Sequence, residues 1–211
     1  ASGRLLVEEN AHSKTVLEYD RNGRVSEITI TKREVQAERG PGLMESRDRI
    51  VYSYEASAVY PFKAVDYKTP NGAPEYAEAT VEFAFNRAGL KTMEKTVRKV
   101  NQFGSVTVNK FYYYDSSNRL ARTTSYSDPD AVTTKRFVSF AGGYSAMVLV
   151  KELALIPGSE YQRGNPTLTS IARDGKHYDI TDTYELNQQQ QPVQIRETNE
   201  YGVVSDISIK Y

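Results

Sequence analysis

The stretch Tyr19-Asp20-Arg21-Asn22-Gly23-Arg24-Val25 has the form of a tight turn between two strands. An aromatic residue comes first, an Asp follows it, and a Gly precedes the return of apolar sequence. The Asp side chain can accept a hydrogen bond from a backbone N–H two residues on, and Gly readily adopts the left-handed conformation that such a bend needs. This stretch therefore predicts a β-hairpin.

The same form recurs along the chain. It returns at Phe85-Asn86-Arg87-Ala88-Gly89-Leu90-Lys91, at Tyr114-Asp115-Ser116-Ser117-Asn118-Arg119-Leu120, and in a degenerate version at Leu186-Asn187-Gln188-Gln189-Gln190-Gln191-Pro192. A second element, Asn101-Gln102-Phe103-Gly104-Ser105-Val106, matches Asn199-Glu200-Tyr201-Gly202-Val203-Val204. A single hairpin is only marginally stable, so we expect these units to pair edge to edge.

Between the turns, apolar and polar residues alternate with a period of two, which is the pattern of a strand. Val81, Phe83 and Phe85 would share one face, opposite Thr80, Glu82 and Ala84. The sequence thus predicts an all-β fold, an antiparallel up-and-down meander of about 12–14 strands that forms a curved single sheet or a barrel. We expect residues 1–211 to be a single β-meander domain of degenerate hairpin repeats.

Two segments allow a helix as well as a strand. Pro74 to Ala84 is rich in Ala and Glu, and Ala146 to Ile156 is the most apolar stretch of the chain. Periodicity does not separate the two structures in a short apolar run. For the second segment we favour a strand, because Val148 and Val150 are β-branched.

The composition excludes several classes of protein. Lys plus Arg and Asp plus Glu both number 27, so the chain lacks the basic surface that nucleic-acid binding needs. There is no Cys, which excludes disulfides and zinc–thiolate sites. No apolar run is long enough for a transmembrane helix. The start at Ala1 is compatible with a leader that has been removed.

The repeats also resemble a known family. Tyr-Asp-x-x-Gly-Arg-Val at 19–25 and Tyr-Asp-x-x-Asn-Arg-Leu at 114–120 look like the YD repeats of Rhs-type and teneurin-type proteins, with a weaker echo at Tyr161 to Leu168. The chain is most similar in this respect to uncharacterised exported lipoproteins of Bacteroidetes with a porin-like β-meander. The resemblance implies a periplasmic, outer-membrane-anchored or cell-surface protein with no known activity and no catalytic residues to carry over.

The sequence offers little for catalysis. His12 and His177 are the only histidines, and no Gly-x-Ser-x-Gly elbow or Gly-x-Gly-x-x-Gly loop occurs. Asp128-Pro129-Asp130 and Thr181-Asp182-Thr183-Tyr184-Glu185 have oxygen ligands suited to Ca²⁺, but turn initiation and a solvated strand face explain them better. We predict no enzyme activity, no cofactor and no metal site. A carboxylate pair of the glycosidase type depends on distance in space and stays open.

Tyrosine is the residue type that suggests a function. The run Phe111-Tyr112-Tyr113-Tyr114 places aromatic rings on both faces of one strand. Exposed tyrosines combine apolar area with a hydroxyl group and suit glycan or protein ligands. We therefore predict ligand binding by Tyr112, Tyr113 and Tyr114. The alternative is that these rings only cover the sheet.

These observations predict an exported, non-catalytic binding or scaffold protein, with a glycan or protein of the cell envelope as its partner. One alternative is an integral outer-membrane β-barrel, favoured by the alternation at Ile207, Ile209 and Tyr211. Charged strand residues such as Glu27 and Lys110 count against it, because they interrupt the apolar band of such barrels. The other alternative is a glycan-active enzyme.

Overall fold

The computed structural model describes residues 3–9, 13–35, 43–71, 73–101, 104–127, 131–141, 154–160 and 165–208. The strands are β1 Gly3–Glu9, β2 Ser13–Tyr19, β3 Val25–Val35, β4 Leu43–Ser53, β5 Lys63–Thr69, β6 Tyr76–Phe85, β7 Lys91–Asn101, β8 Gly104–Tyr114, β9 Leu120–Ser127, β10 Ala131–Ala141, β11 Asn165–Arg173, β12 Lys176–Leu186, β13 Pro192–Asn199 and β14 Gly202–Ser208.

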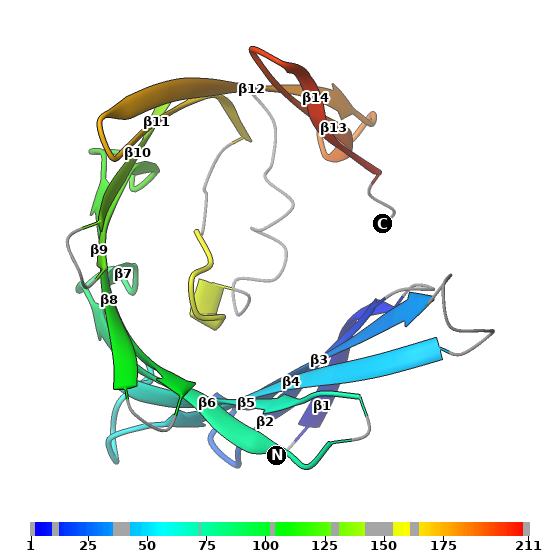
Figure 1. Ribbon diagram of the computed structural model, residues 1–211, viewed down its shortest axis with the longest axis vertical. Helices are drawn as coiled ribbons and strands as arrows, with labels where there is room; N and C mark the ends of the chain where they lie inside the picture. The colour runs from blue at the N-terminus through cyan, green and yellow to red at the C-terminus, as the bar shows by residue number, and fades with distance from the viewer. Residues whose placement is uncertain are drawn as a thin grey trace. The chain divides into compact units, whose positions relative to one another are not determined.

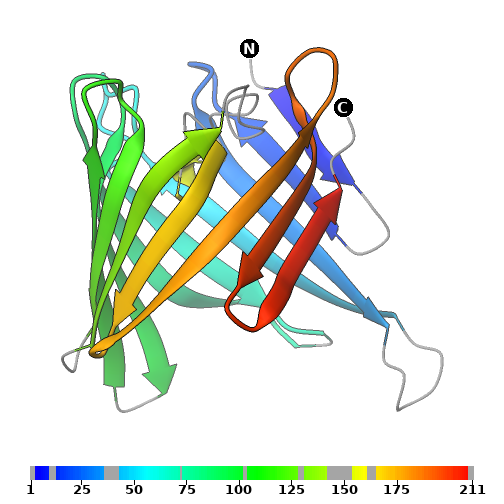
Figure 2. The same cartoon turned by 90° about the horizontal axis from the view of Figure 1, so that it is seen from above.

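All fourteen strands belong to one sheet, in which each strand pairs with the next along the chain (Figure 1). Figure 2 shows consecutive strands running in opposite directions. The hydrogen-bonded order ends at β1 and β14, which are the two edge strands. Helix in the described residues is limited to one short turn at residues 154–155. The predicted all-β, up-and-down meander is therefore confirmed, as a single sheet.

The chain divides into two compact units. Unit 1 comprises Ala1–Leu90 and Glu94–Thr107, and unit 2 comprises Lys91–Met93 and Val108–Tyr211. This division does not test whether either unit folds alone, so a single domain over 1–211 stays a prediction. Each unit is described by itself below.

In unit 1, strand alternation concentrates apolar side chains on one face of the sheet. Leu17, Ile28 and Ile50 lie directly opposite one another on β2, β3 and β4. Their exposed fractions are 0%, 0% and 3%. Ala64 and Val81, which pair across β5 and β6, are also fully buried. Removal of these apolar side chains from water stabilises the sheet.

The two ambiguous segments have different outcomes. Within residues 74–84, the chain enters strand β6 at Tyr76, and Ala79, Val81 and Phe83 are buried on one face. The alternation at Val81 and Phe83 outweighs the helix propensity of Ala and Glu. Most of the segment from Ala146 to Ile156 lies outside the described residues. Its described part contains the short helical turn at residues 154–155 rather than the strand we favoured.

The four turns predicted from the repeat have one geometry, which confirms the hairpins. In each turn, the side-chain oxygen of Asp or Asn accepts hydrogen bonds of 2.8–3.0 Å from the backbone N–H groups two and four residues on. The accepting residues are Asp20, Asn86, Asp115 and Asn187. The third residue after each of them is left-handed, with φ between 59° and 76°. These residues are Gly23, Gly89, Asn118 and Gln190.

The turn residues also set the register of the strands that they join. Tyr19 pairs with Val25, Tyr114 with Leu120, and Leu186 with Pro192, and each pair stands next to a β-bulge. In unit 2, Leu120 forms a buried cluster with Tyr112 and Phe137, against which Tyr114 and Phe140 pack. The repeat therefore positions a core residue as well as a bend.

Candidate functional site

The three predicted ligand-binding tyrosines lie on β8 in unit 2 and alternate between its two faces. Tyr112 is 4% exposed, whereas Tyr113 is 41% exposed. Tyr114 is half-buried, and its hydroxyl donates a 2.8 Å hydrogen bond to the Lys91 carbonyl oxygen. Tyr112 and Tyr114 share one face of the sheet, which we call the Tyr112 face, and Tyr113 belongs to the opposite Tyr113 face. The structure therefore does not bring the three rings together on one surface.

The Tyr113 face carries exposed aromatic side chains beside a cation. Arg122 lies directly opposite Tyr113 on β9, and its guanidinium carbon is 4.1 Å from the centroid of the Tyr113 ring. Tyr126 lies on the same strand and face as Arg122 and is 46% exposed. Its ring meets that of Phe111 edge-on, with 6.0 Å between the centroids. This face offers apolar area, hydroxyl groups and a positive charge to a ligand.

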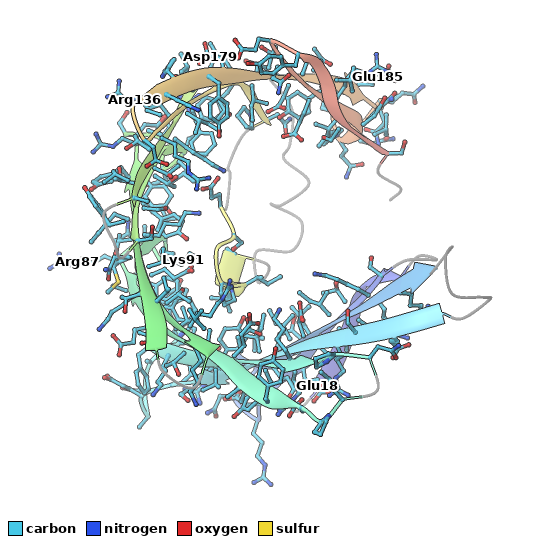
Figure 3. All side chains as sticks on the ribbon, viewed as in Figure 1. Glu18, Arg87, Lys91, Arg136, Asp179 and Glu185 are labelled. Atoms are coloured by element: carbon cyan, nitrogen blue, oxygen red, sulfur yellow. The ribbon has the colours of Figure 1, made fainter. Side chains whose placement is uncertain are left out.

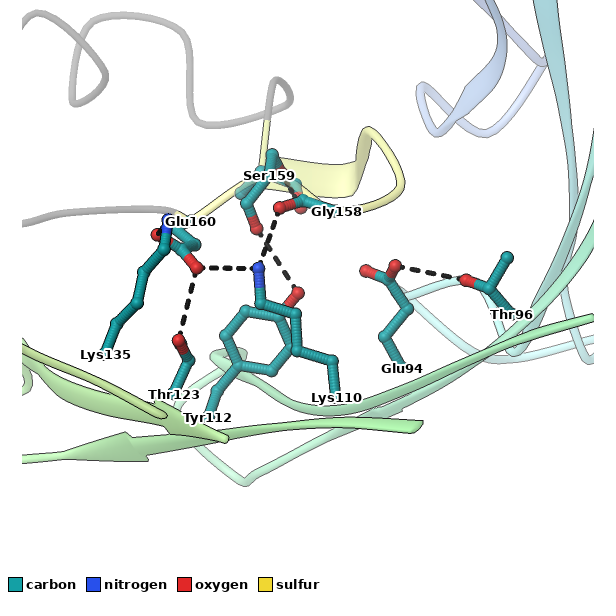
Figure 4. A network of polar contacts seen from close by, with 10 residues as sticks. Glu94, Thr96, Lys110, Tyr112, Thr123, Lys135, Gly158, Ser159 and Glu160 are labelled. Atoms are coloured by element: carbon teal, nitrogen blue, oxygen red, sulfur yellow. Dashed lines mark hydrogen bonds and ion pairs between the residues drawn. The ribbon is translucent and has the colours of Figure 1, made fainter. Parts of the chain in front are cut away.

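The Tyr112 face carries a carboxylate that two lysines share. Glu160 Oε1 is 2.7 Å from Lys110 Nζ and accepts a 3.2 Å hydrogen bond from Thr123 Oγ1, and Glu160 Oε2 is 3.4 Å from Lys135 Nζ (Figure 4). Tyr112, Thr123 and Lys135 form one cross-strand row on β8, β9 and β10. We call Lys110, Tyr112, Thr123 and Lys135 the lysine patch. Its side chains stand on neighbouring strands, so their spacing is set by the sheet.

The carboxylate arrives on a short segment, residues 154–160, which we call the strap. Two hydrogen bonds within the strap shape it: Ser159 N–H donates to the Ile156 carbonyl at 3.1 Å, and Ser159 Oγ donates to the Ala154 carbonyl at 2.9 Å. Its two carbonyls next to Glu160 also contact the patch. Gly158 O accepts from Lys110 Nζ at 3.0 Å, and Ser159 O accepts from the Tyr112 hydroxyl at 3.4 Å. Figure 3 shows Arg136 on the side of the sheet away from the strap.

The lysines hold Glu160 in its charged form. Burial would raise the pKa of this carboxyl, but the attraction and hydrogen bonds of Lys110 and Lys135 outweigh burial, so the pKa lies below its usual value. The ammonium groups of Lys91 and Lys110 also lie 4.8 Å and 5.3 Å from the centroid of the Tyr112 ring. Lys91 is 4% exposed and occupies the position that Val25, Leu120 and Pro192 fill after the other turns.

His177 lies near the other two residue types of a catalytic triad, but the geometry differs from that of a triad. Ser170 Oγ is 3.0 Å from His177 Nε2, and Asp179 Oδ1 is 3.4 Å from the same nitrogen. In a triad, the acid holds the other ring nitrogen, so that Nε2 is free to take the serine proton. The His177 and Asp179 side chains are also exposed, and Ser170 is half-buried. His12 lies outside the described residues.

The acidic segment Thr181 to Glu185 contains one buried carboxyl group. Asp182 is 8% exposed and lies directly opposite Glu197 on β13. Burial first, and the charge of Glu197 second, raise the pKa of Asp182 to about 6. In the part of the chain that the structure describes, no group of three or more His, Cys, Asp or Glu side chains is arranged to hold a metal ion. Asp128, Pro129 and Asp130 lie outside that part.

Unit 1 has a charge cluster centred on a lysine, with Lys32 Nζ 3.6 Å from Asp48 and Arg98 Nε 3.5 Å from Glu78 at its edges. Lys68 Nζ is 2.8 Å from Asp48, 3.6 Å from Glu78 and 3.9 Å from Asp66. Burial raises the pKa of Asp66, although Lys68 opposes this shift. One lysine is thus shared by three acids in unit 1, whereas one acid is shared by two lysines in unit 2.

The lysine patch was not found from the sequence. Lys110, Thr123, Lys135 and Glu160 belong to no short motif, and the strap joins them only through the tertiary fold. The sequence did contain one signal, the strand period of two: Lys110 and Tyr112 are two residues apart on one strand and so share a face. That signal does not select Glu160 from the other acids.

Comparisons with known proteins agree with the fold. No family model matches the sequence, and no curated protein matches it. The structure is similar to that of a porin-like protein from Bacteroides vulgatus ATCC 8482, with a TM-score of 0.56, 12% identity, and coverage of 99% of this chain and 97% of that chain. A porin-like protein from Bacteroides uniformis ATCC 8492 aligns with a TM-score of 0.45, 13% identity, and coverage of 97% and 92%.

At this level of identity, the likeness to the first protein shows the fold alone. It defines the class: an all-β protein with a porin-like β-meander, as one part of the sequence resemblance implied. The likeness to YD-repeat proteins stays a prediction. Among the described residues, no helix has the length and apolarity needed to cross a membrane.

Proposed function

We propose that the chain is a non-catalytic binding or scaffold protein of the bacterial cell envelope, and that the Tyr113 face is its ligand surface. The observation that carries this proposal is the pair of exposed rings, Tyr113 and Tyr126, on one face of neighbouring strands, with the Arg122 guanidinium over the Tyr113 ring. Ring faces suit the apolar side of a sugar, while hydroxyl and guanidinium groups suit its polar edge. A glycan, or a protein of the envelope, is the partner that this chemistry fits.

Two further observations support the absence of catalysis. The Ser170, His177 and Asp179 side chains contact through a single ring nitrogen, which leaves no separate base and orienting acid. Glu160 is engaged in ion pairs with Lys110 and Lys135, and its lowered pKa favours the anion, so it is not a poised general acid. Both clusters are therefore better suited to structure or recognition than to a reaction.

The envelope location is supported by the fold and by the sequence resemblance. The similar protein from Bacteroides vulgatus is described as porin-like, and the repeats resemble those of exported lipoproteins. Expression of the full-length precursor in a Bacteroides host, followed by fractionation and labelling with radioactive palmitate, would test this. Recovery of unlabelled protein in the cytoplasmic fraction would contradict the location.

Binding is tested on a glycan array with the purified chain, followed by titration of any glycan that is retained. We expect Tyr113→Ala to weaken binding about tenfold or more, as loss of a central aromatic contact does, and Tyr126→Ala to act in the same direction. Tyr201→Ala is the matched control, because Tyr201 is 88% exposed on the turn between β13 and β14. Equal binding by all three variants would contradict the proposed ligand surface.

A further inference from the structure

The strap contacts the lysine patch through three consecutive residues. Gly158 offers its carbonyl to Lys110, Ser159 offers its carbonyl to Tyr112, and Glu160 offers its carboxylate to Lys110, Lys135 and Thr123. The turn of the strap, with the Ser159 N–H bonded to the Ile156 carbonyl and Gly158 left-handed at φ +79°, directs these two main-chain carbonyls and the acidic side chain toward the patch. The patch therefore contacts main-chain groups of the strap as well as its charged side chain.

Two residues of the patch are more buried than the strap that covers them. Tyr112 and Thr123 are 4% and 2% exposed and belong to the sheet. Strap residues 154–160 are all half-buried or exposed, including Leu155 and Ile156. Residues 158–160 contact the patch through polar groups, and the same groups on another chain can make such contacts equally well.

The balance of charge between the patch and the strap also favours an external anionic ligand. Two ammonium groups share the single carboxylate of Glu160, so the patch holds more positive charge than the strap neutralises. Because Glu160 is half-buried, salt screens its attraction to the lysines less than on the open surface, and its lowered pKa indicates that the patch favours an anion.

We propose that the lysine patch is a binding site for an acidic peptide segment, which the strap occupies within the same chain. Residues 158–160 would be displaced by a peptide from a partner protein. Such a peptide carries a glutamate, and the carbonyls of the two preceding residues are free to accept hydrogen bonds. This site lies on the Tyr112 face, opposite the surface proposed above for glycans or envelope proteins, and it does not depend on that proposal. Because the strap belongs to the same chain, its effective concentration at the patch is high, and it would compete with short peptides and lower their apparent affinity. Weakening the contact between strap and patch would raise that affinity.

The test measures binding of the capped peptide acetyl-Ile-Pro-Gly-Ser-Glu-amide, which copies residues 156–160, by isothermal titration calorimetry. We expect the Glu160→Gln variant to bind it about tenfold or more tightly than the wild type, since the competing charge-assisted contacts are lost. The same peptide with Gln in place of Glu should bind about tenfold more weakly. Adding Lys110→Met and Lys135→Met to Glu160→Gln should abolish binding.

Controls separate recognition from damage to the fold. Lys176→Met removes an exposed lysine elsewhere in unit 2 and should leave peptide binding by Glu160→Gln unchanged. If Glu160→Gln does not fold, Glu160→Asp keeps the charge but shortens the side chain, and it should still bind the peptide more tightly than the wild type does. Circular dichroism reports whether each variant keeps its strands.

Three results would overturn the proposal. They are equal affinity of Glu160→Gln for the Glu and Gln peptides, binding that survives loss of both lysines, and competition by an oligogalacturonate at a lower concentration than the peptide. The last result would reassign the patch to acidic glycans. The Tyr113 and Tyr126 variants should have no effect here, so failure of this site and failure of the proposed ligand surface are told apart.

Discussion

The turn at residues 19–25 and the turn at residues 114–120 share Tyr, Asp and Arg at equivalent positions, but they differ in how firmly their arginine is held. Arg24 Nε donates to Asp20 Oδ2 at 2.8 Å, and Arg119 Nε donates to Asp115 Oδ2 at 2.7 Å. Each guanidinium also lies over an aromatic ring, that of Tyr54 at 4.4 Å for Arg24 and that of Phe140 at 4.7 Å for Arg119.

Arg24 alone has further partners among the described contacts. Its Nη1 donates to the carbonyls of Ala58 and Glu55 at 3.1 Å and 3.4 Å. Its side chain is 19% exposed, against 44% for Arg119. The repeat therefore specifies the bend and the Asp–Arg pair in both units, while the loop that follows β4 decides whether the arginine also ties the hairpin to the rest of unit 1.

The largest effect should come from the core residue that follows each turn. Leu120→Ala removes a fully buried side chain from the cluster with Tyr112 and Phe137, and should lower the free energy of unfolding by about 2–5 kcal/mol. Val25→Ala should cost less, because a smaller side chain is lost. Urea unfolding followed by circular dichroism measures both. A larger loss for Val25 would mean that the first hairpin, and not the third, holds the tighter core.

The arginines should give the next largest difference. Arg24→Met should lower the free energy of unfolding by about 1–3 kcal/mol, because two carbonyls lose a charged donor and Tyr54 loses its cation. Arg119→Met should cost about 1 kcal/mol or less, as expected for an exposed ion pair. The comparison uses the same urea midpoints. Equal losses would show that the contacts of Arg24 with the loop add no stability.

The turns were predictable from sequence because their chemistry is local. Asp20 or Asn187 finds its hydrogen-bond partners within four residues, and Gly23 or Asn118 supplies the left-handed residue within the same turn. Period-two alternation then placed Tyr112 and Tyr113 on opposite faces. Even the degenerate run at 186–192 forms the same turn, because Asn187 alone provides the acceptor that the bend needs.

The lysine patch was not predictable, because its residues meet through register and the strap. Thr123 faces Tyr112 only because of the bulge and the pairing of β8 with β9. Glu160 contacts Lys110 although 50 positions of sequence separate them. The alternation of apolar and polar residues predicts strands only, so it does not predict the position of a segment that is not a strand. The burial of Tyr112 was missed for a related reason, since it packs with Leu120 and Phe137 on neighbouring strands and its hydroxyl meets the strap.

A smaller difference should separate the left-handed residues. Gly23 has φ of +74°, and a side chain there would meet open space, so Gly23→Ala should cost about 1–2 kcal/mol through backbone strain alone. Asn118 has φ of +59°, and Asn tolerates this conformation, so Asn118→Gly should change stability by about 0.5 kcal/mol or less. Thermal unfolding of the two variants checks this. A large loss for Asn118→Gly would point to a side-chain role that the turn geometry does not require.

The smallest effect on stability should come from Asp115→Asn, because the turn at Asn86 already has Asn at the equivalent position. Asn86 accepts the same two backbone hydrogen bonds without a charge, so Asp115→Asn should keep the bend and lose only the ion pair with Arg119. The backbone N–H of Arg119 first, and then its guanidinium, hold the pKa of Asp115 below the usual value. The folded state thus favours the ionised form of Asp115. The stabilisation is fully present at a pH above the pKa that Asp115 has in the unfolded chain, and it is lost as the pH falls through the lower pKa of the folded state.

The urea midpoint of the wild type should therefore exceed that of Asp115→Asn slightly at pH 7, and the two should converge as the pH is lowered below about 4. Asp115→Ala is the control, because it also removes the acceptor and should be less stable than Asp115→Asn at every pH. A gap between wild type and Asp115→Asn that persists in acid would show that the amide does not reproduce the turn. The charge of Asp115 would then matter less than the shape of its hydrogen bonds.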